Sequence, residues 1–529
     1  MGEVAKKIGN NRAANDAAHK SSIHAFDELS SRRSAELVIS LCGPVGSGVS
    51  FVKETLFTEL EARSYKVLHI KVSDLIDKKA LALNISCDTS DDEDSPEFNR
   101  IYRLQTLGNE LRSALGDDVG AQLAMEEIAI HRTREHPGKS IEEIVPGRVA
   151  YVIDQLKNPK EVALLRAVYR DLFFMVGVLA SYNARKSNLS SMTSELAERL
   201  IERDRKESNA NGQQLEKTLH QSDFFISNTH GNSNRRSEAL KRFVGLIHGD
   251  NGLTPTAKER GMFAAFTAGL RSACLSRQVG ASIMSPEGNL ISTGCNDVPR
   301  AGGGLYEGGD DDQRCFFQKG LCHNDRHKNS LKEDIARIIQ ANGISSEKSI
   351  ALAEKIKQET RVGALIEFSR AVHAEMDAIV GVAREGGAKV AGAIMFTTTY
   401  PCHSCARHIV AAGIKAVYFI EPYEKSLASD LHDDSITHDP DVEPDWSAMA
   451  DISKVAFLQF EGVSPRNYSE FFQSGVRKDA SGNAKKSRIN ADKCSTEYLD
   501  DYKELESRVI QRLHNAAKDV IDDPFPPAA

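Results

Sequence analysis

The chain carries two short segments that limit its fold more than any other feature: His373-Ala374-Glu375 and Pro401-Cys402-His403-Ser404-Cys405. Their His373, Cys402 and Cys405 are donors of the kind that bind zinc. Structural zinc is usually held by four protein ligands, whereas catalytic zinc keeps one position for water. The count of three donors therefore favours a catalytic metal centre.

The spacing of the two segments predicts a helix, a strand and a second helix. The first cysteine follows the histidine by 29 residues. Apolar residues recur with a helical period over residues 371–385, and Gly386-Gly387 end that helix. Residues 390–399 form an apolar run typical of a buried strand, and Pro401 suits the first position of the next helix. Both cysteines would then lie on one helix face and reach one ion.

The acidic residue of the first segment, Glu375, is placed to move protons rather than to bind the metal. Zinc lowers the pKa of bound water from about 15.7 toward about 7. A carboxylate two residues from the histidine can take that proton and pass it to a reacting group. The alternative is a structural His/Cys/Cys site with an unrelated glutamate nearby.

Residues 251–475 resemble the deoxycytidylate deaminase family. The segments that carry the resemblance occur in the family's order: Arg277-Gln278-Val279-Gly280-Ala281, Ser292-Thr293-Gly294-Cys295-Asn296-Asp297-Val298-Pro299, the HAE segment, and TYPCHSC at 399–405. The resemblance implies attack of a zinc-activated water on C4 of cytosine. It also implies that Glu375 is the catalytic proton carrier and that the histidine and two cysteines are the zinc ligands.

The same resemblance implies three substrate contacts. Asn296 matches an asparagine that contacts the nucleoside, Arg277 is a candidate for the phosphate, and Tyr400 matches the deoxycytidylate branch rather than the tRNA-adenosine deaminases. Each residue also has an ordinary structural interpretation. Asn296 suits a turn, Arg277 suits a solvated helix end, and Tyr400 suits core packing.

A glycine-rich loop follows an apolar strand near the start of the chain. The strand covers residues 36–41, and the loop runs Gly43-Pro44-Val45-Gly46-Ser47-Gly48-Val49-Ser50. Such P-loops place backbone N–H groups around phosphates. Because Val49 stands where lysine belongs, we expect nucleotide binding for control rather than phosphoryl transfer, with a ligand-free turn as the alternative. The candidate nucleotide-binding residues are Gly43, Gly46, Ser47, Gly48, Ser50 and Asp154, the last closing an expected strand over 149–154.

Strands and helices alternate after this loop, which predicts an α/β fold with a parallel sheet. We expect a poorly ordered segment over 1–33 and, over 34–250, a P-loop kinase-like parallel sheet with flanking helices. A cytidine-deaminase-like α/β/α domain is expected over 251–475, followed over 476–529 by a linker and a C-terminal helix. Residues 496–517 have a helical pattern, and we expect this helix to pack on the deaminase domain or on a neighbouring subunit.

Composition favours an intracellular enzyme that acts on small molecules. The net charge of −8 gives no general attraction for a nucleic-acid backbone. No secretory signal or membrane-spanning run is visible, and nine scattered cysteines do not suggest a disulfide scaffold, so we expect a cytoplasmic protein. Two alternatives stay open: a deaminase that edits RNA or single-stranded DNA, and a nucleotide- or RNA-sensing module with a structural zinc.

The order of the two halves resembles the bacterial anti-phage dCTP deaminases over nearly the full chain. That resemblance implies deamination of dCMP and dCTP, depletion of nucleotides that a phage needs, regulation through the P-loop half, inhibition by a small RNA, and a homo-oligomer. Some members of the family carry a second zinc, for which Cys315, Cys322, His323 and His327 would be the candidate ligands here. A substrate-covering loop is the preferred interpretation of residues 305–329.

Overall fold

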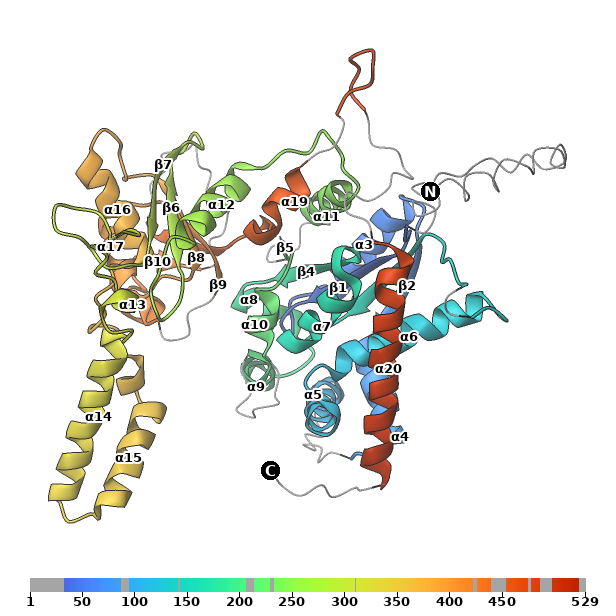
Figure 1. Ribbon diagram of the computed structural model, residues 1–529, viewed down its shortest axis with the longest axis horizontal. Coiled ribbons are helices and arrows are strands. Elements are labelled where there is room, and N and C mark those ends of the chain that lie inside the picture. The colour runs from blue at the N-terminus through green and yellow to red at the C-terminus, as the bar shows by residue number, and fades with distance from the viewer. Residues whose placement is uncertain are drawn as a thin grey trace, which may run out of the picture.

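The computed structural model of the protein describes residues 33–86, 95–140, 143–205, 214–228, 233–309, 311–421, 426–438, 453–473, 477–485 and 497–522. Within these ranges the chain forms two six-stranded sheets covered by helices, one in each half of the molecule (Figure 1). The expected mixed α/β architecture is therefore confirmed. The segment 1–33, expected to be poorly ordered, lies outside the described residues apart from Arg33.

The first sheet has the strand order β12-β5-β4-β1-β3-β2. Its strands are β1 (Leu37–Cys42), β2 (Lys66–Lys71), β3 (Val149–Asp154), β4 (Phe173–Leu179), β5 (Phe224–Ser227) and β12 (Gly462–Val463). The first five are parallel, and β12 runs antiparallel to β5. The central strands β1 and β4 are buried along their whole length, which explains why they appear as continuous apolar runs in the sequence.

Helices cover both faces of the first sheet. They are α3 (Val49–Glu61), α4 (Val72–Ala82), α5 (Pro96–Leu115), α6 (Val119–Glu135), α7 (Pro159–Tyr169), η1 (Arg170–Leu172), α8 (Tyr182–Asn188), α9 (Ser194–Arg205), α10 (Leu215–Leu219), α11 (Ser233–Ile247) and α20 (Leu499–Asp522). Helices α3 and α11 share one apolar core with the sheet, while α4 to α7 share the other. None of the described helices is both long and apolar enough to cross a bilayer.

The second sheet has the order β10-β11-β9-β8-β6-β7. Its strands are β6 (Gly280–Met284), β7 (Leu290–Cys295), β8 (Ile394–Thr399), β9 (Ala416–Glu421), β10 (Ile436–Thr437) and β11 (Val455–Gln459). Strand β6 is antiparallel to β7 and β8, whereas β8, β9, β11 and β10 are mutually parallel. Helix α12 (Ala257–Gly269) packs on one face of this sheet, and α16 (Ala374–Glu385) and α17 (His403–Ala411) contribute to the apolar core on the other.

Between β7 and α16 the chain forms a helical hairpin that projects from the second sheet (Figure 1). It consists of α14 (His323–Ala341) and α15 (Ser346–Glu359), preceded by the short α13 (Cys315–Gln318) and followed by η2 (Arg361–Ala364). The stretch 305–329, interpreted above as a loop over the substrate, therefore includes α13 and the first two turns of α14.

One segment joins the two sheets. Strand β11 of the second sheet leads through Phe460 and Glu461 directly into β12 of the first. Phe460 packs against Phe225 of β5, with ring centroids 6.3 Å apart. Beyond β12, η3 (Pro465–Asn467) and α19 (Tyr468–Phe472) follow, and Phe471 enters the core of the first sheet. Residues 462–472 thus pack against both halves, because the Tyr468 ring also stacks on Phe263 of α12, with centroids 4.0 Å apart.

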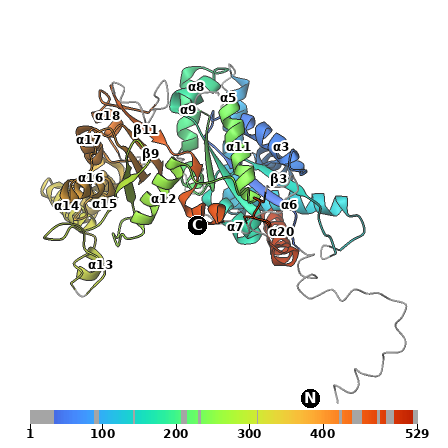
Figure 2. The same cartoon turned by 90° about the horizontal axis from the view of Figure 1, so that it is seen from above.

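The C-terminal helix α20 packs along α6 of the first sheet, which differs from the expected position on the deaminase domain or a second subunit (Figures 1 and 2). A buried ion-pair cluster holds it there. Arg132 of α6 donates to Glu506 of α20 at 2.7 Å and to Glu36 at 2.8 Å. Burial opposes ionisation of Glu36, yet pairing with Arg132 leaves its pKa lowered. Glu36 and Glu506 lie 96 and 374 residues from Arg132 in the sequence, so no local pattern could reveal these contacts.

Replacing Arg132 with methionine should lower the free energy of unfolding of the first half by about 3 to 5 kcal/mol, because two buried carboxylates would lose their cation. Calorimetry or denaturation followed by circular dichroism measures the change. The matched control is Arg508→Ala, which removes a solvent-exposed pair with Glu504 on α20 and should change stability by about 0.5 kcal/mol or less. Equal stability of R132M and wild type would contradict the assigned role of the cluster.

Candidate metal centre

The three expected metal donors meet at the N-termini of two helices. His373 is the N-cap of α16, Cys402 is the N-cap of α17, and Cys405 lies in the first turn of α17. The Sγ atoms of Cys402 and Cys405 lie 3.3 and 3.4 Å from His373 Nδ1. All three donor atoms are within 4.8 Å of one another. One imidazole and two thiols form a donor set that zinc accepts, so the group is compatible with Zn²⁺.

The start of α17 differs slightly from the expectation. Pro401 was expected at the first helical position, but the helix begins at His403 and Cys402 caps it. The Cys402 sulfur accepts a hydrogen bond from the Cys405 backbone N–H at 3.4 Å, which is the role that a capping side chain plays at a helix start. The cap and the metal donor are therefore the same atom.

Glycine in β7 allows α16 to approach the sheet closely. An ideal Cβ built on Gly294 would lie 2.3 Å from the Ala374 carbonyl oxygen and 2.4 Å from the Ala378 nitrogen. Any side chain at Gly294 would therefore push the start of α16 away from the sheet. Asp377 of α16 secures the same contact by accepting a hydrogen bond from the Cys295 backbone at 3.1 Å.

Glu375 lies beside the donor group and is 4% exposed. Burial raises the pKa of its carboxyl, which suits a group that must both take up and release protons. The pKa of Cys402 is lowered, because Cys405 and His373 hydrogen-bond to its sulfur. Across the described ranges no fourth side chain joins the donor group, so a coordination position is left for water.

Asn296 uses its amide to hold the loop that precedes β6. Its Nδ2 donates to the Arg277 carbonyl at 2.8 Å, and its Oδ1 accepts from the Val279 backbone N–H at 2.7 Å. The amide keeps one further N–H and one further lone pair for another partner. The Arg277 side chain is about half exposed, 3.9 Å from Glu421. The structure thus links these two expected substrate residues through one loop.

Tyr400 lies in the same apolar cluster as Cys402 and Cys405. It is 9% exposed, and its ring packs edge-on against Phe419 and Phe457. Its hydroxyl is 2.8 Å from His438 Nε2 and 3.2 Å from Ser429 Oγ. The ring thus packs in the apolar core, and a contact of Tyr400 with substrate stays a prediction.

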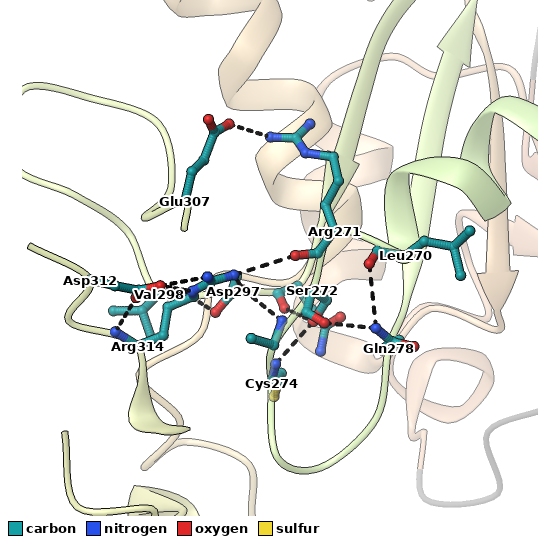
Figure 3. A network of polar contacts seen from close by, with 12 residues as sticks. Leu270, Arg271, Ser272, Cys274, Gln278, Asp297, Val298, Glu307, Asp312 and Arg314 are labelled. Carbon is teal, nitrogen blue, oxygen red and sulfur yellow. Dashed lines mark hydrogen bonds and ion pairs between the residues drawn. The ribbon is translucent and has the colours of Figure 1, made fainter. Parts of the chain in front are cut away.

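A buried polar network that the sequence did not reveal braces the same region (Figure 3). Arg314 pairs with Asp312 at 2.9 Å and reaches Asp297 at 3.4 Å. Asp297 accepts from the Ala273 backbone at 2.9 Å, and its carbonyl accepts from the Val372 backbone N–H at 2.9 Å. Val372 immediately precedes the metal donor His373, so the network fixes the approach to the metal centre. The only sequence signal was the pair Asn296-Asp297, which had suggested a turn.

The second zinc site weighed above gains no support. Within the described part of the chain, Cys315, Cys322, His323 and His327 do not belong to any group of three metal donors. Cys322 instead lies 3.9 Å from Ser276 Oγ, and the His327 ring packs against Phe368 at 5.3 Å.

The expected nucleotide-binding residues gather at the carboxyl edge of the first sheet. The loop follows β1, and Gly46 and Gly48 adopt positive φ angles of 80° and 76°. Gly48 is the N-cap of α3, Ser47 is buried and Ser50 is exposed. Asp154 ends the neighbouring strand β3, opposite Leu41, but its carboxylate is 3.2 Å from His69 and 3.8 Å from Lys53. Gly43 directly follows β1 and is buried.

Comparison with known proteins connects the metal centre to a family. Residues 255–421 match the family model described as the cytidine and deoxycytidylate deaminase zinc-binding region. The deoxycytidylate deaminase of Enterobacteria phage T2 is 28% identical over 167 residues, which cover 31% of this chain and 78% of that protein. The phage T4 deoxycytidylate deaminase is 29% identical over 167 residues, covering 31% and 76%.

A solved dCMP deaminase of the cyanophage S-TIM5, in complex with dCMP and dUMP, is 19% identical and aligns with 39% of this chain and 98% of its own. Its TM-score of 0.22 is too low to carry an argument about the fold. The region that matches the family model includes all three metal donors and Glu375. Residues 255–421 are thus similar to the zinc-binding region of cytidine and deoxycytidylate deaminases.

Proposed function

We propose that the chain is a zinc-dependent deaminase of deoxycytidine nucleotides, converting dCMP or dCTP and water to the uracil nucleotide and ammonia. One observation carries the proposal: a buried carboxylate, Glu375, stands beside a His/Cys/Cys donor group that no fourth described side chain completes. The phage relatives, which are deoxycytidylate deaminases, support the nucleotide as substrate.

In the proposed mechanism, His373, Cys402 and Cys405 would hold zinc, and the bound metal would activate a water by lowering its pKa toward about 7. The Glu375 carboxylate accepts a proton from the attacking water and passes it to N3 of the cytosine ring. As the bond between C4 and the amino nitrogen breaks, the same carboxylate takes the remaining proton of the hydroxyl added at C4 and gives it to the amino nitrogen, so that ammonia leaves and the C4 carbonyl forms. Burial around Glu375 keeps bulk solvent away from these transfers.

For the substrate contacts, we propose that Arg277 binds the phosphate. Asn296 contacts the nucleoside with the amide N–H and the oxygen lone pair that its loop contacts do not use. The half-exposed guanidinium and the shared loop support this pairing. Tyr400 was a third candidate, but its buried ring supports a role in shaping the site from below.

We further propose that residues 34–250 form a P-loop kinase-like regulatory unit that binds a nucleotide, and that residues 251–475 form the deaminase. The loop at the end of β1, followed by the helix α3, supports nucleotide binding. The sequence resemblance extends the proposal to a cytoplasmic homo-oligomer that depletes deoxycytidine nucleotides in anti-phage defence and is restrained by a small RNA.

Replacing Glu375 with glutamine should reduce kcat for dCMP by about 10² to 10⁴-fold, because a general acid/base would be lost. Zinc content, measured by atomic emission, should stay at the wild-type value. Glu385→Gln at the exposed end of the same helix is the matched control and should keep full activity. A Glu375 variant with substantial turnover would remove this residue from the mechanism.

Removing zinc with a chelator should abolish deamination, and added zinc should restore it, since activation of water depends on the metal. Cys402→Ser should lower the bound zinc and the rate together. Cys315→Ser, which lies outside the donor group, should change neither. Full activity of the chelated protein would contradict the proposed chemistry.

Replacing Arg277 with alanine should raise KM for dCMP about 10- to 100-fold, the loss expected for a charge-assisted hydrogen bond to phosphate. Deoxycytidine, which has no phosphate, serves as the control substrate and should be unaffected. A parallel assay with dCTP and a single-stranded oligonucleotide tests the substrate class. Ammonia release from the oligonucleotide alone would favour the editing alternative.

A further inference from the structure

The P-loop is in contact with a carboxylate of the chain itself. Asp204, at the end of α9, is fully buried, and its Oδ2 accepts a hydrogen bond from the Val45 backbone N–H at 2.6 Å. The Lys157 ammonium donates to the two carboxylate oxygens at 3.0 and 3.3 Å and to the Gly43 carbonyl at 3.0 Å. The Asp204 carboxylate and the Lys157 ammonium that neutralises it thus both contact the loop.

Helices α8 and α9 and the turn between them, residues 182–205, lie over the loop and are here called the cover. The cover makes further contacts with the loop. Arg185 of α8 donates to the Val45 carbonyl at 2.9 Å, and Asn188 donates to the Gly46 carbonyl at 2.8 Å. An ideal Cβ on Gly46 would lie only 2.5 Å from the Arg185 carbonyl oxygen, so the cover is in close contact with the loop.

The cover is anchored by a small apolar cluster of its own. This cluster joins α9 to α5 and is distinct from the three clusters that line the two sheets. Figure 2 shows α5, α8 and α9 together at one end of the first sheet. Val45 of the loop packs against this same cluster, whereas α9 contributes no residue to the cores of the two sheets, so separation of α9 from the loop would leave those cores closed.

The loop keeps the capacity to hold a phosphate. Within the described chain, the N–H groups of Gly46, Gly48, Val49 and Ser50 have no hydrogen-bond partner. The buried Ser47 hydroxyl also lacks one. These groups surround the N-terminus of α3, where the helix dipole favours an anion.

The cations near the loop differ from those of an ordinary P-loop. The usual lysine position is taken by Val49, which is 4% exposed, and Asp154 is already paired with His69 and Lys53. Lys157 contacts the loop from the neighbouring strand end and is neutralised by Asp204. A ligand phosphate could take over this cation only by displacing the carboxylate.

We propose that Asp204 is an internal substitute for a ligand phosphate. A nucleoside di- or triphosphate binds by displacing Asp204 from the Val45 N–H and from Lys157, and α9 then separates from the loop. The inference rests on the proposed nucleotide-binding role of this loop and adds its regulation: the closed cover keeps affinity low until the carboxylate is displaced.

The test is ATP binding to the full chain, measured by titration calorimetry. Asp204→Asn keeps the shape of the side chain but removes its charge, and it should bind ATP at least tenfold more tightly than wild type. Glu195→Gln, an exposed carboxylate on the same helix, should leave the affinity unchanged. The double variant Lys157→Met with Asp204→Asn should lose the gain, because the cation that the phosphate recruits is gone.

Hydrogen exchange of the wild-type chain provides a second measurement that needs no variant. Saturating ATP should protect the loop amides and increase exchange in α9. Equal or weaker ATP binding by folded D204N, absence of ATP binding in both proteins, or unchanged exchange in α9 would overturn the proposal. The same preparations are assayed for deamination of dCMP, which depends on the metal centre. A failure of the proposed deaminase function is therefore distinguishable from a failure of this inference.

Discussion

The close packing of α16 on β7 is the contact on which the metal centre depends. His373 and Glu375 lie at the start of α16, and their positions follow from how near that helix comes to the sheet. Gly294 makes the approach feasible, because any Cβ there would collide with the Ala374 carbonyl. The same packing brings His373 to the N-terminus of α17, where Cys402 and Cys405 complete the donor group. The absence of a side chain at one position of a strand thus sets the geometry of the donor group.

The two halves are joined by more than a linker. Strand β11 belongs to the sheet that carries the metal donors, and its continuation, β12, pairs with β5 of the other sheet. The residue after β5, Asn228, donates from its side chain to the Ser47 carbonyl in the P-loop at 2.8 Å. A short run of strand pairing and hydrogen bonds therefore connects the loop with the second sheet. The regulatory role proposed for the first half would act through this connection.

Local patterns in the sequence predicted the parts of the structure that depend on near neighbours. Apolar periodicity and the positions of glycine and proline predicted the helix after His373, the strand before Tyr400 and the loop after β1. The patterns failed where the deciding contact is distant. The C-terminal helix lies on α6 because Glu506 reaches Arg132, and the expected helical position of Pro401 shifted because Cys402 itself became the cap.

The sequence alone determined the chemistry available at the site: the types, number and order of the donors, and the acidic residue beside them. Tertiary structure decided where the remaining polar residues lie and which groups they contact. It placed the Tyr400 ring in the core, engaged the Asn296 amide with a loop, left Cys315 away from the metal donors, and set Asp204 against the P-loop. Residue type decides which chemistry a side chain can perform. Burial and contacts with residues far away in the sequence decide which role it takes, because both arise only when the chain folds.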